Sequence, residues 1–353
     1  MRNMKAASLH AIGDFRVDTL PVPTIQGEEL LVKIGACGIC GSDIPRIFEL
    51  GTSKQKYPLT IGHEFSGTIE AAGPDADQGL VGKRGAFFPL IPCRKCDNCL
   101  TGNYAMCDDY DYLGSRRDGA FADYCAVPSA WHFVASHNPK TTLEALSMTE
   151  PATVAQHAIR KSGLSAGNSI VIFGAGPIGI IAARWAKIFG AALVLLVDIS
   201  DEKVAFAQKR GIAAINGTRQ DFLAELRRYT GGKLADVVIE GTGSGAALNN
   251  AIHCVKAFGT ITLMGNPHKD TTIGLAEHSM LLRKEVAITS VWNSYFANQP
   301  INEWHYTVSM LDEGRLVVED LITHKTNLDG LPQLCADIRS GKLSICKAMF
   351  HPE

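Results

Sequence analysis

Four cysteines lie within a stretch of fifteen residues: Cys93, Cys96, Cys99 and Cys107. Thiolates this close together can all face one tetrahedral Zn²⁺, and a four-cysteine zinc site leaves no coordination position open. Two disulfides or four buried thiols are the alternatives, but dense disulfide frameworks belong to short secreted chains, and this chain has 353 residues. The spacing therefore predicts a structural zinc that holds a loop together and does no chemistry.

A second group of metal-type residues is spread along the chain, at Cys40, His63, Glu64 and Glu150. A thiolate, an imidazole and a carboxylate can form a zinc site whose fourth position takes water or substrate. Taken singly, each residue has an ordinary alternative: a core cysteine, a surface His-Glu pair, or a Glu-Pro that begins a segment. Their joint presence with the four-cysteine run and a dinucleotide motif favours an open, catalytic zinc site.

That motif occupies residues 174–179, with the key positions Gly174, Gly176, Pro177, Ile178 and Gly179. Glycines let the backbone approach a pyrophosphate, and the following helix N-terminus supplies N–H donors. Asp198 ends the next predicted strand, nineteen residues after the last of these glycines, and its carboxylate suits ribose hydroxyls but repels a 2′-phosphate. The alternatives are a tight strand–helix turn and an acid that only ends a strand. Strand, motif, helix and acid in register predict NAD binding.

The elements that must position these residues fall into two kinds, as expected for two domains at this length. Residues 1–150 contain short strand-like segments interrupted by Gly and Pro, which predicts a β-rich barrel or sandwich. From residue 153, helices alternate with apolar strands, which predicts a doubly wound parallel sheet. The predicted strands are 169–173, 192–197, 235–240, 259–264 and 286–291. The last sixty residues, which begin with a helix over 304–313, are expected to return to the first domain.

Composition excludes several classes of protein. A formal net charge of −2 gives no footprint for nucleic acid or an anionic membrane. The most apolar stretch, 170–197, contains several glycines, Arg184 and Lys187, so it does not read as a membrane span. The first residues lack the apolar core of a signal peptide. Ten cysteines without an export signal predict a reducing, cytoplasmic setting.

Together these segments resemble the zinc-dependent medium-chain dehydrogenase/reductase family over essentially the full length. The resemblance rests on Gly38–Asp43, Gly62–Glu64, the four cysteines, Gly119–Tyr124, Glu150-Pro151 and Gly174–Gly179. Glutamate at position 150, where classical alcohol dehydrogenases have cysteine, resembles the polyol (sorbitol) dehydrogenase branch. The fold class it implies is α/β: a GroES-like β-rich catalytic domain over 1–152, to which 294–353 returns, and a Rossmann domain with a doubly wound parallel sheet over 153–293.

The resemblance also implies the site residues and the reaction. Catalytic zinc is expected near Cys40, His63, Glu64 and Glu150, with Glu64 ligating directly, through water, or only in some states. Lys203 joins the glycine motif and Asp198 in binding NAD. The expected reaction is zinc-dependent, NAD-linked oxidation of a secondary alcohol on a polyol or polyol phosphate, with two zincs per chain. Homodimers or homotetramers are expected.

Ser42 is the expected acceptor of the hydroxyl proton, although a serine here can equally be a helix N-cap, and both roles can coexist. Several segments resemble the members of this branch that oxidise galactitol 1-phosphate to tagatose 6-phosphate: Gly41–Phe48, Gly114–Gly119 and Ser290–Tyr295. Pro45 stands where sorbitol dehydrogenases have a histidine of the proton relay. For a substrate phosphate, Arg46 is the first candidate and Arg116 and Arg117 the second, because guanidinium groups suit phosphate oxygens. Their alternative is a solvated surface.

Three other functions stay open at this stage. The substrate could be unphosphorylated, such as sorbitol, L-iditol, another alditol or threonine. A zinc-free, quinone-reductase-type relative is disfavoured because the zinc ligand set is present. From a different class, the chain could be a nucleotide-sensing protein without enzymatic activity on the same fold.

Overall fold

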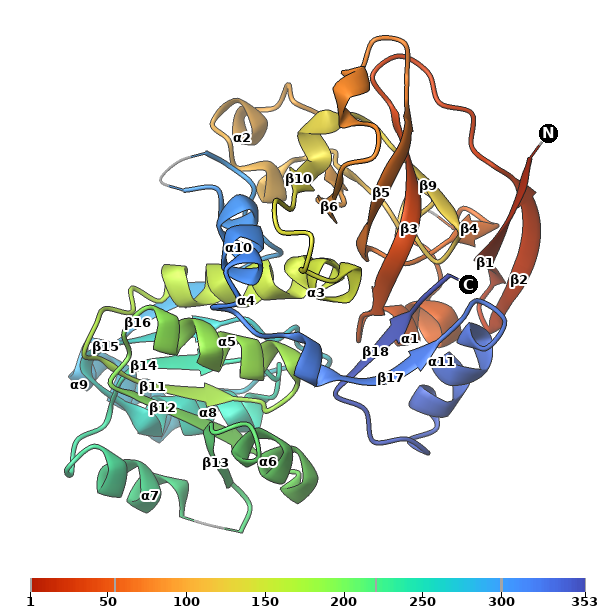
Figure 1. Ribbon diagram of the computed structural model, residues 1–353. Coiled ribbons are helices and arrows are strands. Elements are labelled where there is room, and N and C mark those ends of the chain that lie inside the picture. Colours follow the sequence, from red (N-terminus) through yellow and green to blue (C-terminus); the bar gives the residue numbers. More distant parts are fainter. Residues whose placement is uncertain (1, 54, 220, 299–300, 353) are drawn as a thin grey trace. The chain divides into compact units, whose positions relative to one another are not determined.

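The computed structural model describes residues 2–53, 55–219, 221–298 and 301–352 (Figure 1). The chain divides into two compact units: unit 1, made of Met1–Pro151 and Tyr295–Glu353, and unit 2, made of Ala152–Ser294. It passes from the first unit to the second inside helix α4 (Thr149–Lys161). Among the described residues, no helix combines the length and apolar character needed to cross a membrane.

Unit 1 is built mainly on antiparallel strands, with β17 and β18 paired in parallel, and it is β-rich as predicted. Its largest sheet has seven strands, in the order β10-β6-β5-β3-β18-β17 with β9 also paired to β3. A three-stranded sheet (β2-β1-β4) and a two-stranded one (β7-β8) complete it. The strands are β1 (Asn3–Ala11), β2 (Asp14–Pro21), β3 (Leu30–Ile39), β4 (Leu59–Thr60), β5 (Glu64–Ala72), β6 (Arg84–Phe87), β7 (Leu90–Ile91), β8 (Asp111–Tyr112), β9 (Tyr124–Val127), β10 (Phe133–Ala135), β17 (Ile322–Thr326) and β18 (Lys347–Phe350).

The helices of unit 1 are short. Its α-helices are α1 (Asp43–Pro45), α2 (Asp97–Leu100), α3 (Leu143–Ser147), α10 (Glu303–Asp312) and α11 (Leu331–Arg339). A π-helical turn η1 (Arg46–Leu50) and 3₁₀ turns η2 (Gln78–Leu80), η3 (Tyr104–Met106), η4 (Ala130–His132) and η5 (Glu319–Leu321) fill the connections. The core holds large aromatic side chains, including stacked Phe65 and Phe87, whose ring centroids are 5.4 Å apart.

Unit 2 contains one parallel six-stranded sheet in the order β13-β12-β11-β14-β15-β16. Numbered along this unit, the order is 3-2-1-4-5-6, which is that of dinucleotide-binding doubly wound sheets and confirms the predicted fold class. Its strands are β11 (Ser169–Phe173), β12 (Leu193–Asp198), β13 (Ala213–Asn216), β14 (Ala235–Glu240), β15 (Val255–Leu263) and β16 (Ala287–Ser290). Helices α5 (Pro177–Ile188), α6 (Asp201–Gln208), α7 (Phe222–Tyr229), α8 (Gly245–Cys254) and α9 (Leu275–Lys284) connect them (Figure 1).

Several elements follow directly from the sequence. The strand Ser169–Phe173 is apolar and buried after its first residue because both faces of a parallel sheet are covered. Ser200 caps α6 by accepting a hydrogen bond from the Lys203 N–H. The pattern missed β13, which has only four residues (Ala213–Asn216), and α7 beside it.

Candidate metal and dinucleotide sites

The cysteine lobe, defined here as residues 93–107, gathers four thiols within unit 1. The Sγ atoms of its four cysteines all lie within 4.8 Å of one another. Cys93 Sγ and Cys99 Sγ are 3.9 Å apart, and the Cys93 N–H donates to Cys107 Sγ at 3.2 Å. None of these four cysteines is in a disulfide, so the disulfide alternative is wrong.

The chemistry of the cysteine lobe fits zinc. Backbone N–H groups of Lys95 and Cys96 lower the pKa of Cys93 to about 6, which favours the thiolate that metals bind. Four thiol donors match a closed tetrahedral zinc site. Cys93, Cys96, Cys99 and Cys107 would therefore hold a structural zinc.

Cys40, His63 and Glu64, called the catalytic cluster after their predicted role, are brought together by the pairing of β3 with β5. Gly38 in β3 lies opposite Glu64 in β5, so the residues that follow one strand meet those that begin the other. The ligand atoms of the three residues lie within 4.8 Å of one another. His63 Nδ1, a buried atom, has no hydrogen-bond partner among the described residues. A thiol, an imidazole and a carboxylate so placed fit an open zinc site.

Asp43 forms a second layer behind this cluster. Its side chain is fully buried, accepts a hydrogen bond from the Cys40 N–H at 2.9 Å, and lies 3.5 Å from His63 Nδ1. Arg46 donates to it at 2.8 Å. Burial disfavours the imidazolium of His63, but the negative charges of Asp43 and Cys40 outweigh burial and raise the pKa of His63 well above 6.5. The cluster thus concentrates negative charge where a dication would balance it.

Lys347, from β18, is a buried cation that the sequence did not single out. Its ammonium pairs with Glu64 Oε2, and their side chains are only 5% and 2% exposed. β18 pairs with β3 so that Met349 lies opposite Gly38. A Cβ atom on Gly38 would lie 2.2 Å from Glu64 Oε2 and 2.8 Å from Lys347 Cε. Glycine at position 38 therefore leaves the space that this ion pair fills.

Glu150 lies outside the close group formed by the catalytic cluster. It is the second residue of α4, and its Oε1 accepts a hydrogen bond from the Tyr112 hydroxyl at 3.3 Å. Burial raises its pKa to about 7, opposed by the charges of His63 and Lys347 and reinforced by Glu64. Glu150 thus shares the electrostatic environment of the cluster, and its predicted role as a zinc ligand stays a prediction.

The remaining predicted residues of unit 1 have different surroundings. Ser42 is exposed and caps α1 without a side-chain hydrogen bond. Arg116 stacks on Tyr110, with its Cζ 3.9 Å from the ring centroid, and donates to the Tyr110 carbonyl oxygen. Arg117 is half-exposed and lies 3.8 Å from Asp111, a weak pairing. Of the three arginines, only Arg46 contacts the residues around the catalytic cluster.

The glycine motif of unit 2 has the geometry a dinucleotide needs. Gly174 has φ +103°, a conformation that favours glycine, and a Cβ on Gly179 would lie 1.9 Å from Gly174 O. Gly176 is the N-cap of α5 with no side-chain cap bond, and a Cβ there would meet no described atom within 4 Å. Pro177 and Ile178 open the helix. This leaves exposed N–H donors at the helix N-terminus, which fit a pyrophosphate.

Asp198 ends β12 beside a cavity of about 360 Å³. Its Oδ2 accepts from the Ala175 N–H at 2.7 Å and its Oδ1 from the Ser200 N–H at 2.9 Å. Each carboxylate oxygen keeps a further lone pair for a ribose hydroxyl. The predicted Lys203 lines the same cavity, and so does Thr218, which sequence reasoning missed. Thr218 could have been found from its position just after β13, because ligands bind at the carboxyl ends of parallel strands.

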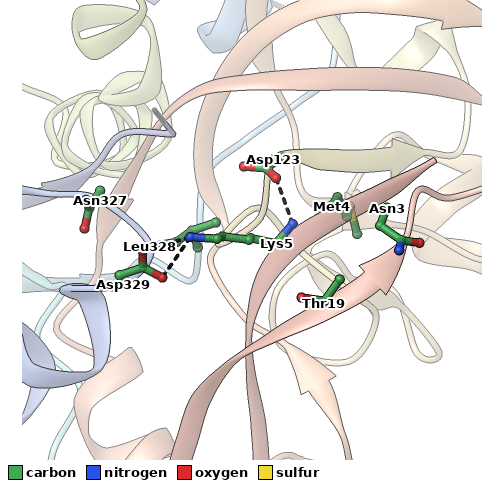
Figure 2. A pocket seen from close by; sticks show the side chains of 8 residues that line it. All are labelled: Asn3, Met4, Lys5, Thr19, Asp123, Asn327, Leu328 and Asp329. Carbon is green, nitrogen blue, oxygen red and sulfur yellow. Dashed lines mark hydrogen bonds and ion pairs between the residues drawn. The ribbon is translucent and has the colours of Figure 1, made fainter.

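Two further cavities were not predicted. One, of about 310 Å³, follows the carboxyl ends of β14, β15 and β16 and includes Glu240, Met264 and Trp292. The other, of about 320 Å³, lies beside β1 in unit 1 and contains none of the predicted residues (Figure 2). Lys5 crosses it, with its Nζ 2.8 Å from Asp329 and its N–H 2.8 Å from Asp123 (Figure 2). Lys5 and Asp329 already form an ion pair in this cavity, and none of the residues that line it belongs to the catalytic cluster.

Comparisons with known proteins show matches to two family models. Residues 26–137 match the alcohol dehydrogenase GroES-like domain, and residues 177–313 match the zinc-binding dehydrogenase family. Galactitol 1-phosphate 5-dehydrogenase of Escherichia coli (strain K12) is 34% identical over 343 residues, covering 95% of this chain and 96% of that protein. Sorbitol dehydrogenase of Bacillus subtilis (strain 168) is 35% identical over 273 residues, covering 76% and 77%.

Solved structures extend the match in three dimensions. The crystal structure of galactitol-1-phosphate dehydrogenase from E. coli has a TM-score of 0.90 at 32% identity, covering 99% of this chain and 100% of that one. A protein from Sinorhizobium meliloti 1021, described as a zinc-binding dehydrogenase bound to NADP, has a TM-score of 0.91 at 25% identity with complete coverage of both chains. Ligand chemistry, fold and these similarities agree, and the chain belongs to the zinc-dependent medium-chain dehydrogenase/reductase family.

Proposed function

We propose that this oxidoreductase carries out NAD-linked oxidation of a polyol phosphate, converting galactitol 1-phosphate to tagatose 6-phosphate. The observation that carries the proposal is the open Cys40–His63–Glu64 donor set in a chain 34% identical to a galactitol 1-phosphate 5-dehydrogenase. Membership of a dehydrogenase family sets aside the non-enzymatic sensor.

Cys40, His63 and Glu64 would hold the catalytic zinc, and the charges of His63 and Glu64 also act on Glu150. When bound, zinc supplies Lewis-acid polarisation of an alcohol oxygen, and the dinucleotide supplies the hydride acceptor. Asp43 fixes the Cys40 backbone by accepting its N–H, and its charge orients the His63 ring. Ser42, two residues after Cys40 and free of a cap bond, is the proposed proton acceptor.

Arg46 is the proposed partner of the substrate phosphate. One of its N–H groups is engaged by Asp43, and a guanidinium has five donors, so others remain for phosphate oxygens. Its side chain is partly exposed, at 19%, which leaves a face for a ligand.

Kinetics on paired substrates test the substrate directly. We expect kcat/KM with NAD to be higher for galactitol 1-phosphate than for galactitol. A higher value for galactitol would remove the phosphate hypothesis.

A second candidate is oxidation of an unphosphorylated alditol such as sorbitol. It is favoured by the engagement of Arg46 with Asp43 and of Arg116 with Tyr110, and by the 35% identity to a sorbitol dehydrogenase. Sorbitol belongs in the same kinetic panel, where a preference for it would establish this candidate.

The predicted homo-oligomer is also part of the proposal. β16 ends the six-stranded sheet, and exposed apolar side chains lie on it (Ile288), on its neighbour β15 (Phe258) and on α9 (Leu275 and Leu282). An unpaired edge with apolar neighbours favours association with a second copy of the chain. Light scattering should give at least twice the chain mass, and Ile288→Lys should lower it.

A further inference from the structure

Asp201, the first residue of α6, comes two residues after Ile199, which lines the dinucleotide cavity, and contacts two partners. Its Oδ2 is 2.6 Å from Arg219 Nη2, and its Oδ1 accepts from Asn216 Nδ2 at 2.6 Å. Asn216 is 5% exposed, and it also donates to the Ile199 carbonyl oxygen at 3.0 Å. One oxygen of the Asp201 carboxylate therefore accepts a hydrogen bond from a buried amide, while the other oxygen pairs with an arginine.

The same network shapes the wall of the cavity. The Oδ1 atom of Asn216 accepts from both the N–H and the hydroxyl of Thr218, at 2.9 and 2.7 Å. Gly217 and Thr218 line the cavity beside Asp198, and Arg219 is the next residue along the chain. Asp198 itself precedes Asp201 by only three residues and accepts the Ser200 N–H between them. Arg219 is thus a cation next in sequence to two residues of the cavity wall, and Asp198 lines the same cavity.

We propose that Asp201 determines cofactor specificity by engaging Arg219, which would otherwise bind the 2′-phosphate of NADP. This inference rests on the dinucleotide site of the proposed function and adds a second layer to it. Asp198 repels a 2′-phosphate directly. Asp201 pairs with Arg219, which would otherwise bind the 2′-phosphate and offset the repulsion from Asp198.

The balance of forces favours this role over a purely structural one. Arg219 is 72% exposed, and an exposed ion pair contributes little to folding stability. The same exposure leaves the guanidinium able to change partners, and a phosphate dianion is a stronger partner than one carboxylate. Asp201 keeps its position because Asn216 and the N-terminus of α6 stabilise it.

The test compares binding of 2′,5′-ADP, which carries the 2′-phosphate, with 5′-AMP, which lacks it, by titration calorimetry on the full chain. Asp198→Ser should allow weak binding of 2′,5′-ADP. Adding Asp201→Asn should tighten it about tenfold, since one charge-assisted contact is gained, while 5′-AMP changes little. Adding Arg219→Met to this double variant should abolish the gain.

A matched control uses another arginine pair of unit 2. Glu225 pairs with Arg228 at 2.8 Å on α7, so Asp198→Ser with Glu225→Gln makes the same change in net charge and also releases an arginine. It should leave 2′,5′-ADP binding as in Asp198→Ser. An equal gain in this control, or a gain that survives Arg219→Met, would overturn the proposal, and so would no gain at all. Failure of the unaltered chain to bind 5′-AMP would instead overturn the dinucleotide site, whatever substrate the enzyme oxidises.

Discussion

The cysteine lobe and the catalytic cluster both gather predicted metal ligands in unit 1, but they are supported differently. The lobe takes all four ligands from residues 93–107, and its donors are alike. The catalytic cluster takes three unlike donors from the ends of β3 and β5, and buried charges surround it: Asp43 behind His63, and Lys347 against Glu64. One site is complete in a short segment, whereas the other depends on the sheet.

The difference has a physical basis. A closed four-thiolate site needs only that its ligands reach one point, which a short loop achieves. An open site must keep its donors in place with one coordination position unfilled by protein, so the surroundings have to hold them. Metal removal and substitutions should therefore affect the two sites to different extents.

Metal removal should separate them most strongly. Mild chelation is expected to abolish activity while far-ultraviolet circular dichroism stays largely unchanged, because the metal of the catalytic cluster is open to exchange and that of the cysteine lobe is enclosed. Metal analysis should find two zincs per chain before treatment and one after it. Cys40→Ser should lose the activity-linked metal. A single zinc in the untreated protein, or activity-linked metal that survives Cys40→Ser, would contradict this.

Lys347→Met should have the next largest effect. It leaves the Glu64 carboxylate buried without its cation, and breaking a buried ion pair on one side costs roughly 3–5 kcal/mol in the free energy of unfolding. Denaturant unfolding measures this cost. We also expect faster release of the metal of the catalytic cluster to a chromogenic chelator, with the metal of the cysteine lobe unaffected.

Two further variants isolate the pair itself. Glu64→Gln combined with Lys347→Met removes both charges and should recover much of the lost stability. Lys342→Met removes an exposed lysine that pairs with Asp337 and should change little. If Lys347→Met unfolds at the same denaturant concentration as the unaltered protein, the ion pair does not support the cluster.

Arg46→Ala tests whether Arg46, which donates to Asp43 behind the catalytic cluster, also binds the substrate phosphate. Loss of a charge-assisted bond to phosphate should lower kcat/KM roughly ten- to a hundredfold for galactitol 1-phosphate, equivalent to about 1.5–3 kcal/mol, and much less for galactitol. Equal losses on both substrates would mean that Arg46 acts only through Asp43. Arg116→Ala is a useful comparison because that arginine stacks on Tyr110.

The smallest effect concerns His132, in the aromatic packing near the cysteine lobe. Its Nδ1 lies 2.9 Å from the Phe88 carbonyl oxygen and must donate to it, and burial lowers its pKa to about 4 from 6.5. Below pH 6.5, His132 is therefore protonated in the unfolded chain but not in the folded chain. The free energy of unfolding falls as the pH falls toward 4. From pH 7 to 5 this amounts to about 2 kcal/mol.

Denaturant unfolding at the two pH values measures this contribution. His132→Asn keeps a donor for Phe88 but does not titrate, so it should reduce the difference between pH 7 and pH 5 by about that amount. An unchanged difference would mean that other groups govern the acid sensitivity of unit 1.

What could be predicted from the sequence follows the same division. The cysteine lobe, the glycine motif and strands such as Ser169–Phe173 are local patterns, and periodicity and spacing are enough to predict them. The joint presence of Cys40, His63 and Glu64 with the cysteine run and the glycine motif favoured an open zinc site, and the family resemblance supported it. Spacing alone does not reveal the pairing of β3 with β5 that brings the three residues together.

The contacts that the sequence did not reveal are long-range. Lys347 reaches Glu64 only because β18 pairs with β3, and nothing in the local sequence around Lys347 marks it as buried. Tyr112 and Thr218 gained their roles in the same way, through the strands they follow or end. Glu150 was predicted as a ligand, yet the described geometry groups only the other three, so its role still depends on the metal experiments.

Placing Lys347 on β18 has a consequence for biosynthesis. A ribosome makes Cys40, His63 and Glu64 early, then all of Ala152–Ser294, and only afterwards Lys347–Phe350. Until β18 arrives, the nascent chain has β3 without one of its neighbouring strands and Glu64 without its ammonium partner. Unit 2 can fold as soon as it leaves the exit tunnel, because its sequence is continuous. The group formed by Cys40, His63 and Glu64 therefore gains its buried lysine only after the whole of unit 2 has been made, and zinc delivered earlier to the growing polypeptide meets an incomplete site.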